Sequence, residues 1–391
     1  MRKLNKTAAC GILAAALAAG TLSGCSKAID GTKTVATVGD EKVTLGLASY
    51  MTRDQQAQTM SYYNMLMSQY GVSGSASNVW DQKGDDGKTV GESSKDSVMK
   101  TINQLYVLKA HAADYDVTIT EDEEKAIKEA AAEFIKDNDE KILKKLAVSE
   151  DDIVTYLELV TIRSKMHDPM TADVDTEVSA NEKDQTRVTI VKVSTEGTEK
   201  DDDGNTIDLT DEEKAQKKDL AQQVLDKVKA SDDVANADMD ALAKEVDDSL
   251  SATAPAFTTA GSTDDTLDEA VQDAALELKD GEVADSVIEG DDGYYVVRLD
   301  KMLDEDATEN KEKTVISERK SDLFDSTLED WVKEEKIKVK DKVWDQITVT
   351  DSVSFVYKSA DSSDDTKSSD AQDSTEDTSS QDNSEDTTTE D

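Results

Sequence analysis

The sequence has 391 residues, of which 36% are hydrophobic and only 4% aromatic, and its formal net charge is −44. This length has room for two domains and a tail. Such an acidic surface repels nucleic-acid phosphates and anionic lipids, so we exclude nucleic acid as a partner.

The first 24 residues have the features of a signal peptide. A basic stretch at 2–6 precedes an apolar stretch at 8–20, which is too short to span a bilayer of about 30 Å. The sequence L-S-G-C at 22–25 resembles the lipobox of bacterial lipoproteins. This resemblance implies cleavage before Cys25, lipidation of Cys25, and a lipid-anchored protein on the extracytoplasmic face of the cell membrane. The alternative is an ordinary secretory signal with a chance cysteine.

A linker at 25–33 leads to a predicted hairpin at 34–44 and then to a long helix from Leu45 to about Tyr70. The helix is rich in methionine and tyrosine, whose side chains suit a surface that accommodates varied apolar polypeptide segments. The same side chains also suit an ordinary hydrophobic core. The candidate binding residues on this helix are Met51, Met60, Tyr62 and Tyr63.

Further helices are predicted up to residue 184. Apolar spacing indicates one helix that includes Val98. A capping box of Thr120 and Glu123 begins another, and Ser149 caps a third, which we expect to stop near Pro169. Residues 34–184 therefore predict a mainly helical domain.

The next segment predicts a strand, a helix, short helices and a hairpin, in that order. The strand covers 188–193, and the first helix follows a capping box at 210–213. A further helix at 267–278 leads to the hairpin at 279–300, whose second strand alternates in its apolar residues. The period of two places Tyr295, Val297 and Leu299 on one face, and Tyr294 and Val296 on the other.

This order, and two short sequences within it, resemble the parvulin family of peptidyl-prolyl isomerases. The run from Arg187 to Val193 is similar to the parvulin opening strand, and G-E-V at 281–283 followed by G-Y-Y-V-V-R-L at 293–299 is similar to its ending. The resemblance covers 185–303 and implies a proline-binding pocket. The family carries a histidine in each of these two strands, and the matching positions here are Thr189 and Tyr295. The pocket positions implied by the resemblance are Phe257, Leu267, Val271 and Tyr295.

The helical part resembles the chaperone domain of the PrsA and SurA foldases. The hairpin sequence V-A-T-V-G-D-E-K-V-T and the run 114–124 carry this resemblance. It implies that a segment at 304–357, with a helix at 314–336, returns to complete the chaperone domain around an inserted parvulin-like module. We therefore predict an α+β protein. Residues 358–391 are acidic and lack large aliphatic side chains, which is typical of a disordered tail.

These resemblances imply a membrane-anchored foldase or chaperone whose partners are unfolded or proline-containing exported polypeptides. Because the family histidines are replaced, we expect its parvulin-like domain to be weak or inactive as an isomerase. The alternatives are an active prolyl isomerase that works without the histidine pair, and a surface lipoprotein in which the parvulin fold is a spacer. Prolyl isomerisation is a bond rotation and needs no nucleophile. We therefore name no catalytic residue and expect no cofactor and no metal site.

Overall fold

The computed structural model describes residues 17–19, 29–69, 78–198, 206–260 and 267–358. Cys25, and the predicted tail from residue 359 onward, lie outside the described residues. The chain forms two compact units, which are described separately. Among the described residues, no helix combines the length and the apolar character needed to cross a membrane.

The first unit contains the described residues within 1–102, 120–158 and 338–391, so segments that lie far apart in the sequence fold together. Its three-stranded sheet has the order β3-β2-β9, and the Lys340 amide donates to the Val35 carbonyl at 2.8 Å. The strands of this unit are β1 (Leu17–Ala19), β2 (Thr34–Val38), β3 (Glu41–Thr44), β9 (Ile337–Val339) and β10 (Phe355–Tyr357). Its helices, two of which continue into the second unit, are α1 (Leu45–Gln69), α2 (Val90–His111), α3 (Glu121–Asp137), α4 (Glu140–Leu146), α5 (Glu150–Met170) and α11 (Asp341–Trp344).

Buried polar side chains of α1 hold the segment near residue 350. Arg53 donates to the Thr348 carbonyl at 2.8 Å, and Gln56 donates to the Val353 carbonyl at 2.6 Å. Both side chains are at least 95% buried. Because a buried donor is costly without an acceptor, these two contacts fix the return of the chain onto α1.

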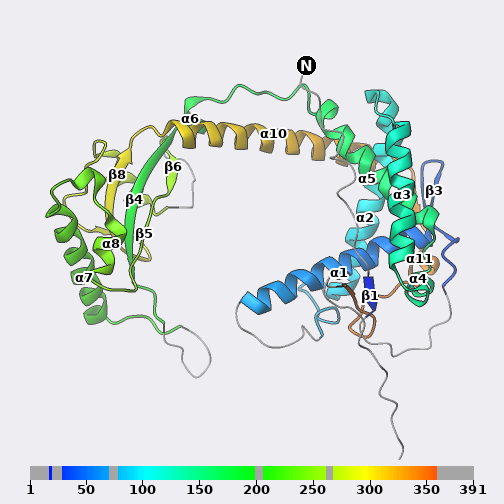
Figure 1. Ribbon diagram of the computed structural model, residues 1–391, viewed down its shortest axis with the longest axis horizontal. Helices are drawn as coiled ribbons and strands as arrows, with labels where there is room; N and C mark the ends of the chain where they lie inside the picture. The colour runs from blue at the N-terminus through cyan, green and yellow to red at the C-terminus, as the bar shows by residue number, and fades with distance from the viewer. Residues whose placement is uncertain (1–16, 20–28, 70–77, 199–205, 261–266, 359–391) are drawn as a thin grey trace, which may run out of the picture. The chain divides into compact units, whose positions relative to one another are not determined.

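The described residues of the predicted signal peptide form a strand in this unit. β1 pairs antiparallel with β10, with Leu17 opposite Tyr357 and Ala19 opposite Phe355. The two strands form a separate two-stranded sheet beside α1 (Figure 1).

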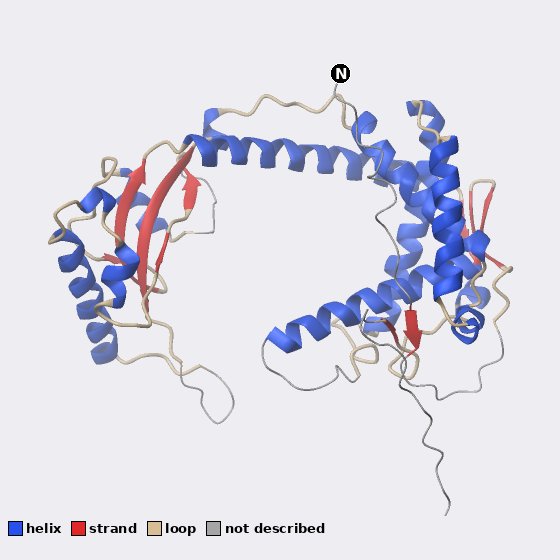
Figure 2. Ribbon diagram, viewed as in Figure 1, coloured by secondary structure: helices blue, strands red, loops and turns tan. Residues whose placement is uncertain are grey.

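The second unit contains 103–119 and 159–337 and is built around a five-stranded antiparallel sheet. The two long strands, β4 and β8, lie side by side at its centre (Figure 2). Its strands are β4 (Gln185–Ser194), β5 (Ala252–Thr253), β6 (Ala256–Thr258), β7 (Ile288–Glu289) and β8 (Gly293–Lys301). Its helices, besides the ends of α2 and α5, are η1 (Ala112–Tyr115), α6 (Ala180–Lys183), α7 (Asp211–Lys229), η2 (Val234–Asn236), α8 (Met239–Lys244), α9 (Glu269–Leu276) and α10 (Glu305–Glu334).

The two faces of this sheet contact different helices. Val191, Tyr294 and Val296 pack against α7 and α8, whereas Tyr295 and Val297 pack against α9. This is the alternation predicted from the hairpin sequence, and the predicted α+β class is confirmed.

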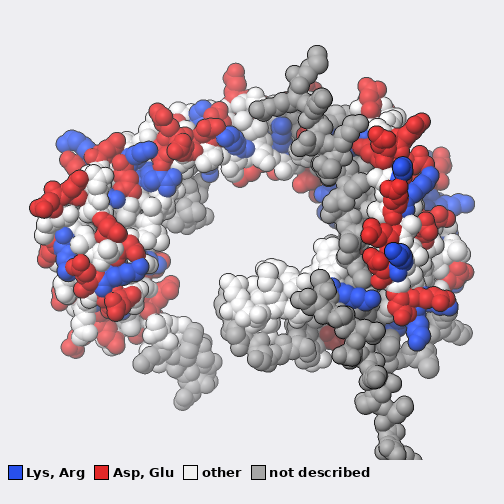
Figure 3. Space-filling model, in the orientation of Figure 1, with Lys and Arg blue, Asp and Glu red and all other residues white. Residues whose placement is uncertain are grey.

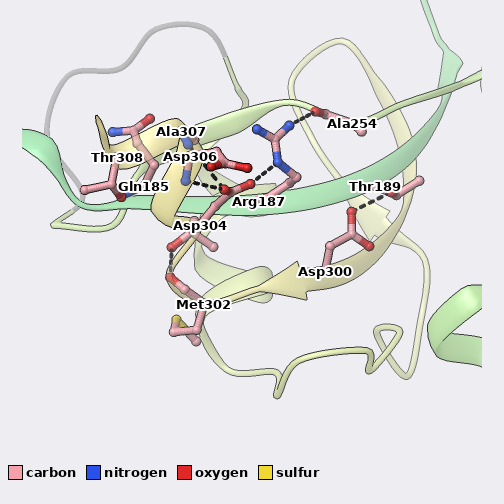
Figure 4. A network of polar contacts seen from close by, with 11 residues as sticks. Gln185, Arg187, Thr189, Ala254, Asp300, Met302, Asp304, Asp306, Ala307 and Thr308 are labelled. Atoms are coloured by element: carbon pink, nitrogen blue, oxygen red, sulfur yellow. Dashed lines mark hydrogen bonds and ion pairs between the residues drawn. The ribbon is translucent and has the colours of Figure 1, made fainter. Parts of the chain in front are cut away.

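A polar network joins the start of β4 to the start of α10 (Figure 4). Asp304 caps α10 by accepting from the amides of Asp306 and Ala307, and its other carboxylate oxygen accepts from Arg187 Nε. The Asp304 amide donates to the Gln185 carbonyl at 2.8 Å. α10 therefore leaves the sheet in a direction fixed by side chains of both elements.

The division into units differs from the predicted boundaries. We expected 34–184 to form one domain, completed by the segment 304–357. Instead, α10 groups with the sheet of the second unit, and the boundary falls within α2 and α5. The residues that join the first unit begin at Lys338.

Candidate functional site

A pocket of about 370 Å³ opens on the face of the sheet that α9 covers. Its apolar wall comes from β4, β8 and the residue before the cap of α9. Its polar rim carries three carboxylates and one ammonium group, so the rim is net negative. The lining residues are Ile190, Leu267, Tyr295, Lys192, Asp268, Asp291 and Asp292.

Three of these side chains form a hydrogen-bonded group. The Tyr295 hydroxyl donates to Asp292 Oδ1, and Lys192 Nζ donates to Asp292 Oδ2 at 2.5 Å. Lys192 and Tyr295 are cross-strand partners on β4 and β8, which places the ammonium 5.9 Å from the ring centroid. Asp292 lies in the tight turn before β8, so the turn and the strand pairing together assemble the group.

The electrostatics of this group keep the tyrosine neutral and the carboxylate charged. The hydrogen bonds from Lys192 and Tyr295 lower the pKa of Asp292. Burial of Tyr295 raises the pKa of its hydroxyl, and the bond to Asp292 raises it further. At neutral pH the Tyr295 hydroxyl therefore keeps its proton and donates a hydrogen bond to the Asp292 carboxylate.

Asp268 fixes the other side of the rim. Its Oδ1 accepts from the Ala270 amide at 2.9 Å, capping α9, and its Oδ2 accepts from the Asp291 amide at 2.7 Å. One carboxylate thus ties the start of α9 to the turn before β8, which holds the mouth of the pocket in place.

The predicted pocket residues fall into one buried cluster, but only two of them line the pocket. Phe257 and Val271 are completely buried in the core behind it. Leu267 and Tyr295 line the wall. The pocket wall therefore includes two of the four predicted positions.

The two positions matched to the family histidines do not form a pair. Thr189 pairs with Arg298 on the face opposite Tyr295, and its hydroxyl donates to Asp300 at 2.6 Å. The β4 residues on the Tyr295 face are instead Val188, Ile190 and Lys192, and the last two of these line the pocket. The alignment of this short strand with the family strand was uncertain by one residue. Because side chains alternate along a strand, a shift of one residue moves every side chain to the other face of the sheet.

Sequence reasoning missed five lining residues, which are Ile190, Lys192, Asp268, Asp291 and Asp292. The turn sequence around Asp292-Gly293 was a usable signal for Asp292, because it precedes a strand that faces the pocket. Lys192 could be assigned to the pocket only once the register between β4 and β8 was known, because that register places it opposite Tyr295.

The lining residues suit binding rather than covalent chemistry. None of them is a histidine, cysteine or serine, and the tyrosine hydroxyl is held by a carboxylate. An apolar wall that excludes water can hold a twisted prolyl amide, which is what rotation about this bond requires. The negative rim favours peptides that carry a positive charge next to the bound residue.

A second candidate surface lies in the first unit, at the C-terminal end of α1. Met51 and Met60 are more than 90% buried and belong to the core, with Met60 packed against Trp80 and Val349. Tyr62 and Tyr63, in contrast, are 57% and 39% exposed, and nearby Met65, which we had not selected, is 58% exposed. The helix carries no charged residue after Asp54, and its end appears as an uncharged patch in Figure 3. Contact sites for polypeptides commonly expose apolar side chains in this way.

Comparison with known proteins identifies the second-unit module. A family model described as the PPIC-type PPIase domain matches residues 199–313. Residues 199–313 are therefore similar to a PPIC-type PPIase domain. The parvulin-type prediction is thus confirmed, although the matched segment starts after β4 and extends into α10.

Solved structures with weaker similarity come from the group that the sequence resembles. The PrsA foldase from Lactococcus lactis is 14% identical, with 80% of this chain and 96% of that chain covered and a TM-score of 0.32. The PrsA peptidylprolyl isomerase from Bacillus cereus is 19% identical, with 69% and 96% covered and a TM-score of 0.30. A SurA-like chaperone from Campylobacter jejuni is 14% identical, with 66% and 99% covered and a TM-score of 0.18. No curated protein matches the chain.

Proposed function

We propose that this protein is a foldase that holds unfolded, newly exported polypeptides at the extracytoplasmic face of a membrane. The observation that carries the proposal is the PPIC-type PPIase domain, because prolyl peptide segments are what such a domain acts on. The exposed, uncharged end of α1 supports a second contact with the same polypeptide. The lipobox-like sequence at 22–25 supports anchoring through Cys25.

The holding function is tested with the full chain and an unfolded client. A reduced, denatured protein is diluted into buffer with and without equimolar protein, and aggregation is followed by light scattering. We expect a delay in aggregation, with serum albumin at the same concentration as the control. Aggregation at the uninhibited rate in the presence of equimolar protein contradicts the proposal.

The anchor is tested by partition into detergent. We expect the protein from expressing cells to enter the detergent phase with acyl chains on Cys25, and the Cys25→Ala variant to carry no acyl chains and to keep residues 1–24. Mass spectrometry of the N-terminal peptide identifies the acyl chains. An unmodified Cys25 contradicts the anchoring.

Prolyl isomerisation is the second candidate function, and the apolar wall of the α9-face pocket favours it. The charge of the rim predicts that peptides with lysine or arginine before proline react faster than those with glutamate. Exchange NMR on such a peptide pair, with the full chain and with Leu267→Asp, measures this. A rate equal to the uncatalysed one for both peptides leaves the domain as a binding module.

A further inference from the structure

The edge of β10 is filled by a strand from the segment that we propose is removed. Among the described residues, the strand that pairs with β10 is β1. β1 is Leu17-Ala18-Ala19, which lies before the proposed cleavage point at Cys25. Cleavage would therefore leave the amide and carbonyl groups of β10 on this edge without their present partners.

β10 is held in place by contacts that do not involve β1. The Tyr357 hydroxyl donates to Asp54 Oδ1 at 2.8 Å, and the Arg53 guanidinium lies 5.2 Å from the Phe355 ring centroid. Just before the strand, Gln56 holds the Val353 carbonyl at 2.6 Å. Because α1 supplies all three contacts, the outer edge of β10 keeps its position when β1 leaves.

A buried polar side chain, that of Asn138, also binds the backbone of β1. Asn138 is 6% exposed, and its Oδ1 accepts from the Leu17 amide at 2.9 Å. Its Nδ2 donates to the Phe134 carbonyl at 2.8 Å, which fixes the orientation of the side chain. The Leu17 side chain is completely buried. The site thus recognises one backbone N–H, one strand edge and one apolar side chain.

We propose that the edge of β10 together with Asn138 binds an extended apolar segment of an exported polypeptide, and that the leader strand occupies this site until it is cleaved. The inference rests on the proposed processing and holding function. To that function it adds where the client binds and when the site becomes available. A strand edge contributes main-chain hydrogen bonds that do not depend on sequence, so it accepts many clients. The strand that occupies the site in this structure, β1, indicates the class of client segment: a short, uncharged stretch of leucine and alanine.

The test compares the precursor with the processed protein. The precursor is the full chain with Cys25→Ala, which cannot be lipidated and retains its leader; the processed protein is purified from membranes in detergent. The probe is a fluorescein-labelled peptide with the sequence of residues 14–22 between lysines. We expect the processed protein to bind the probe at least about tenfold more tightly by anisotropy, because the leader competes within the same chain of the precursor.

Two variants and one control variant locate the binding site of the probe. Asn138→Leu in the processed protein is expected to weaken probe binding about tenfold, whereas Asn310→Leu, an exposed asparagine of α10, leaves it unchanged. Leu17→Asp in the precursor is expected to restore binding by evicting β1. Hydrogen exchange at 355–357 should be slow in the precursor, fast in the free processed protein and slow again with probe.

The outcomes separate this inference from the proposed function. Equal probe binding by precursor and processed protein, or no binding by the processed protein, overturns the β10 site. If the processed protein still delays client aggregation in that case, only the site is wrong. If no processed protein forms, or if it does not delay aggregation, the proposed function itself fails.

Discussion

At the scale of single residues, the pair of Arg187 and Asp304 has the clearest energetic role. Asp304 is almost completely buried, whereas about a third of the Arg187 side chain is exposed. The carboxylate also caps α10, so it serves both the helix and the ion pair. Arg187 lowers the pKa of Asp304 through its hydrogen bond.

The substitution Asp304→Asn removes the charge and keeps the cap, because asparagine caps helices as well as aspartate does. We expect it to lower the free energy of unfolding by about 1–2 kcal/mol at pH 7, after allowance for the exposure of Arg187. Since the folded-state pKa is lowered, the stabilisation is present above the ordinary carboxyl value and is lost as the pH falls through the folded-state value. The difference between variant and wild type should therefore shrink below about pH 4.

Urea unfolding followed by circular dichroism measures this difference. Asp322→Asn, an exposed mid-helix position of α10, is the matched control and should change stability by less than about 0.5 kcal/mol. If the loss of unfolding free energy in Asp304→Asn does not depend on pH, the hydrogen-bond geometry of this side chain matters and its charge does not.

Some residue roles could not be predicted from the sequence. Arg53, Asp54 and Gln56 are polar and lie next to one another in a helix, which is typical of an exposed surface. They are buried because their partners lie about 300 residues later in the chain. No local sequence pattern indicates such distant partners. The residues selected on α1 from the sequence were therefore methionines and tyrosines only.

At the scale of elements, helix starts were predictable where a side chain caps the backbone. The capping boxes at Thr120 and Thr210 were predicted and are confirmed. The start of α10 was placed too late, at Thr314, because the residues from Glu305 to Lys313 are nearly all polar and show no apolar stripe. The helix begins instead at the Asp304 cap and is supported by pairs such as Glu309 with Lys313, four residues apart.

α1 is the element whose two halves differ most in environment. Its first four turns are buried, and its last turns expose Tyr62, Tyr63 and Met65. We predict that replacing these three residues by serine raises the concentration needed to delay client aggregation about tenfold, because a few exposed apolar anchors carry most of a contact energy. Stability should change by less than about 1 kcal/mol, since surface substitutions remove little packing.

The control for this prediction keeps the helix and changes its polar neighbours. Ser61→Ala, Asn64→Ala and Ser68→Ala together alter three exposed positions on the same turns and should leave aggregation delay unchanged. If the two triple variants behave alike in light scattering, the end of α1 is not a client-binding surface.

At the scale of the whole molecule, the family resemblance implied that the chain returns to its first domain near its C-terminal end, but nothing in the sequence marks where the two compact units divide. The boundaries fall inside α2 and α5, where the sequence has no linker and no break in helical spacing. In a continuous helix, no local sequence signal shows which hydrophobic core each half of the helix packs against. Composition and the turn and capping residues therefore predicted the helices and strands better than they predicted which of them pack in the same unit.

The net charge of −44 is a property of the whole chain, and it predicts how stability depends on salt. Like charges repel more strongly in the compact state than in the extended one, and the Debye length falls from about 30 Å at 0.01 M to about 10 Å at 0.1 M. The Tm should therefore rise by a few degrees when salt is raised over this range. Sodium chloride and choline chloride should act alike, because screening depends on ionic strength, and sucrose at equal osmolality should have a smaller effect. A Tm that falls with salt would mean that attractive pairs such as Arg187 with Asp304 outweigh the repulsion.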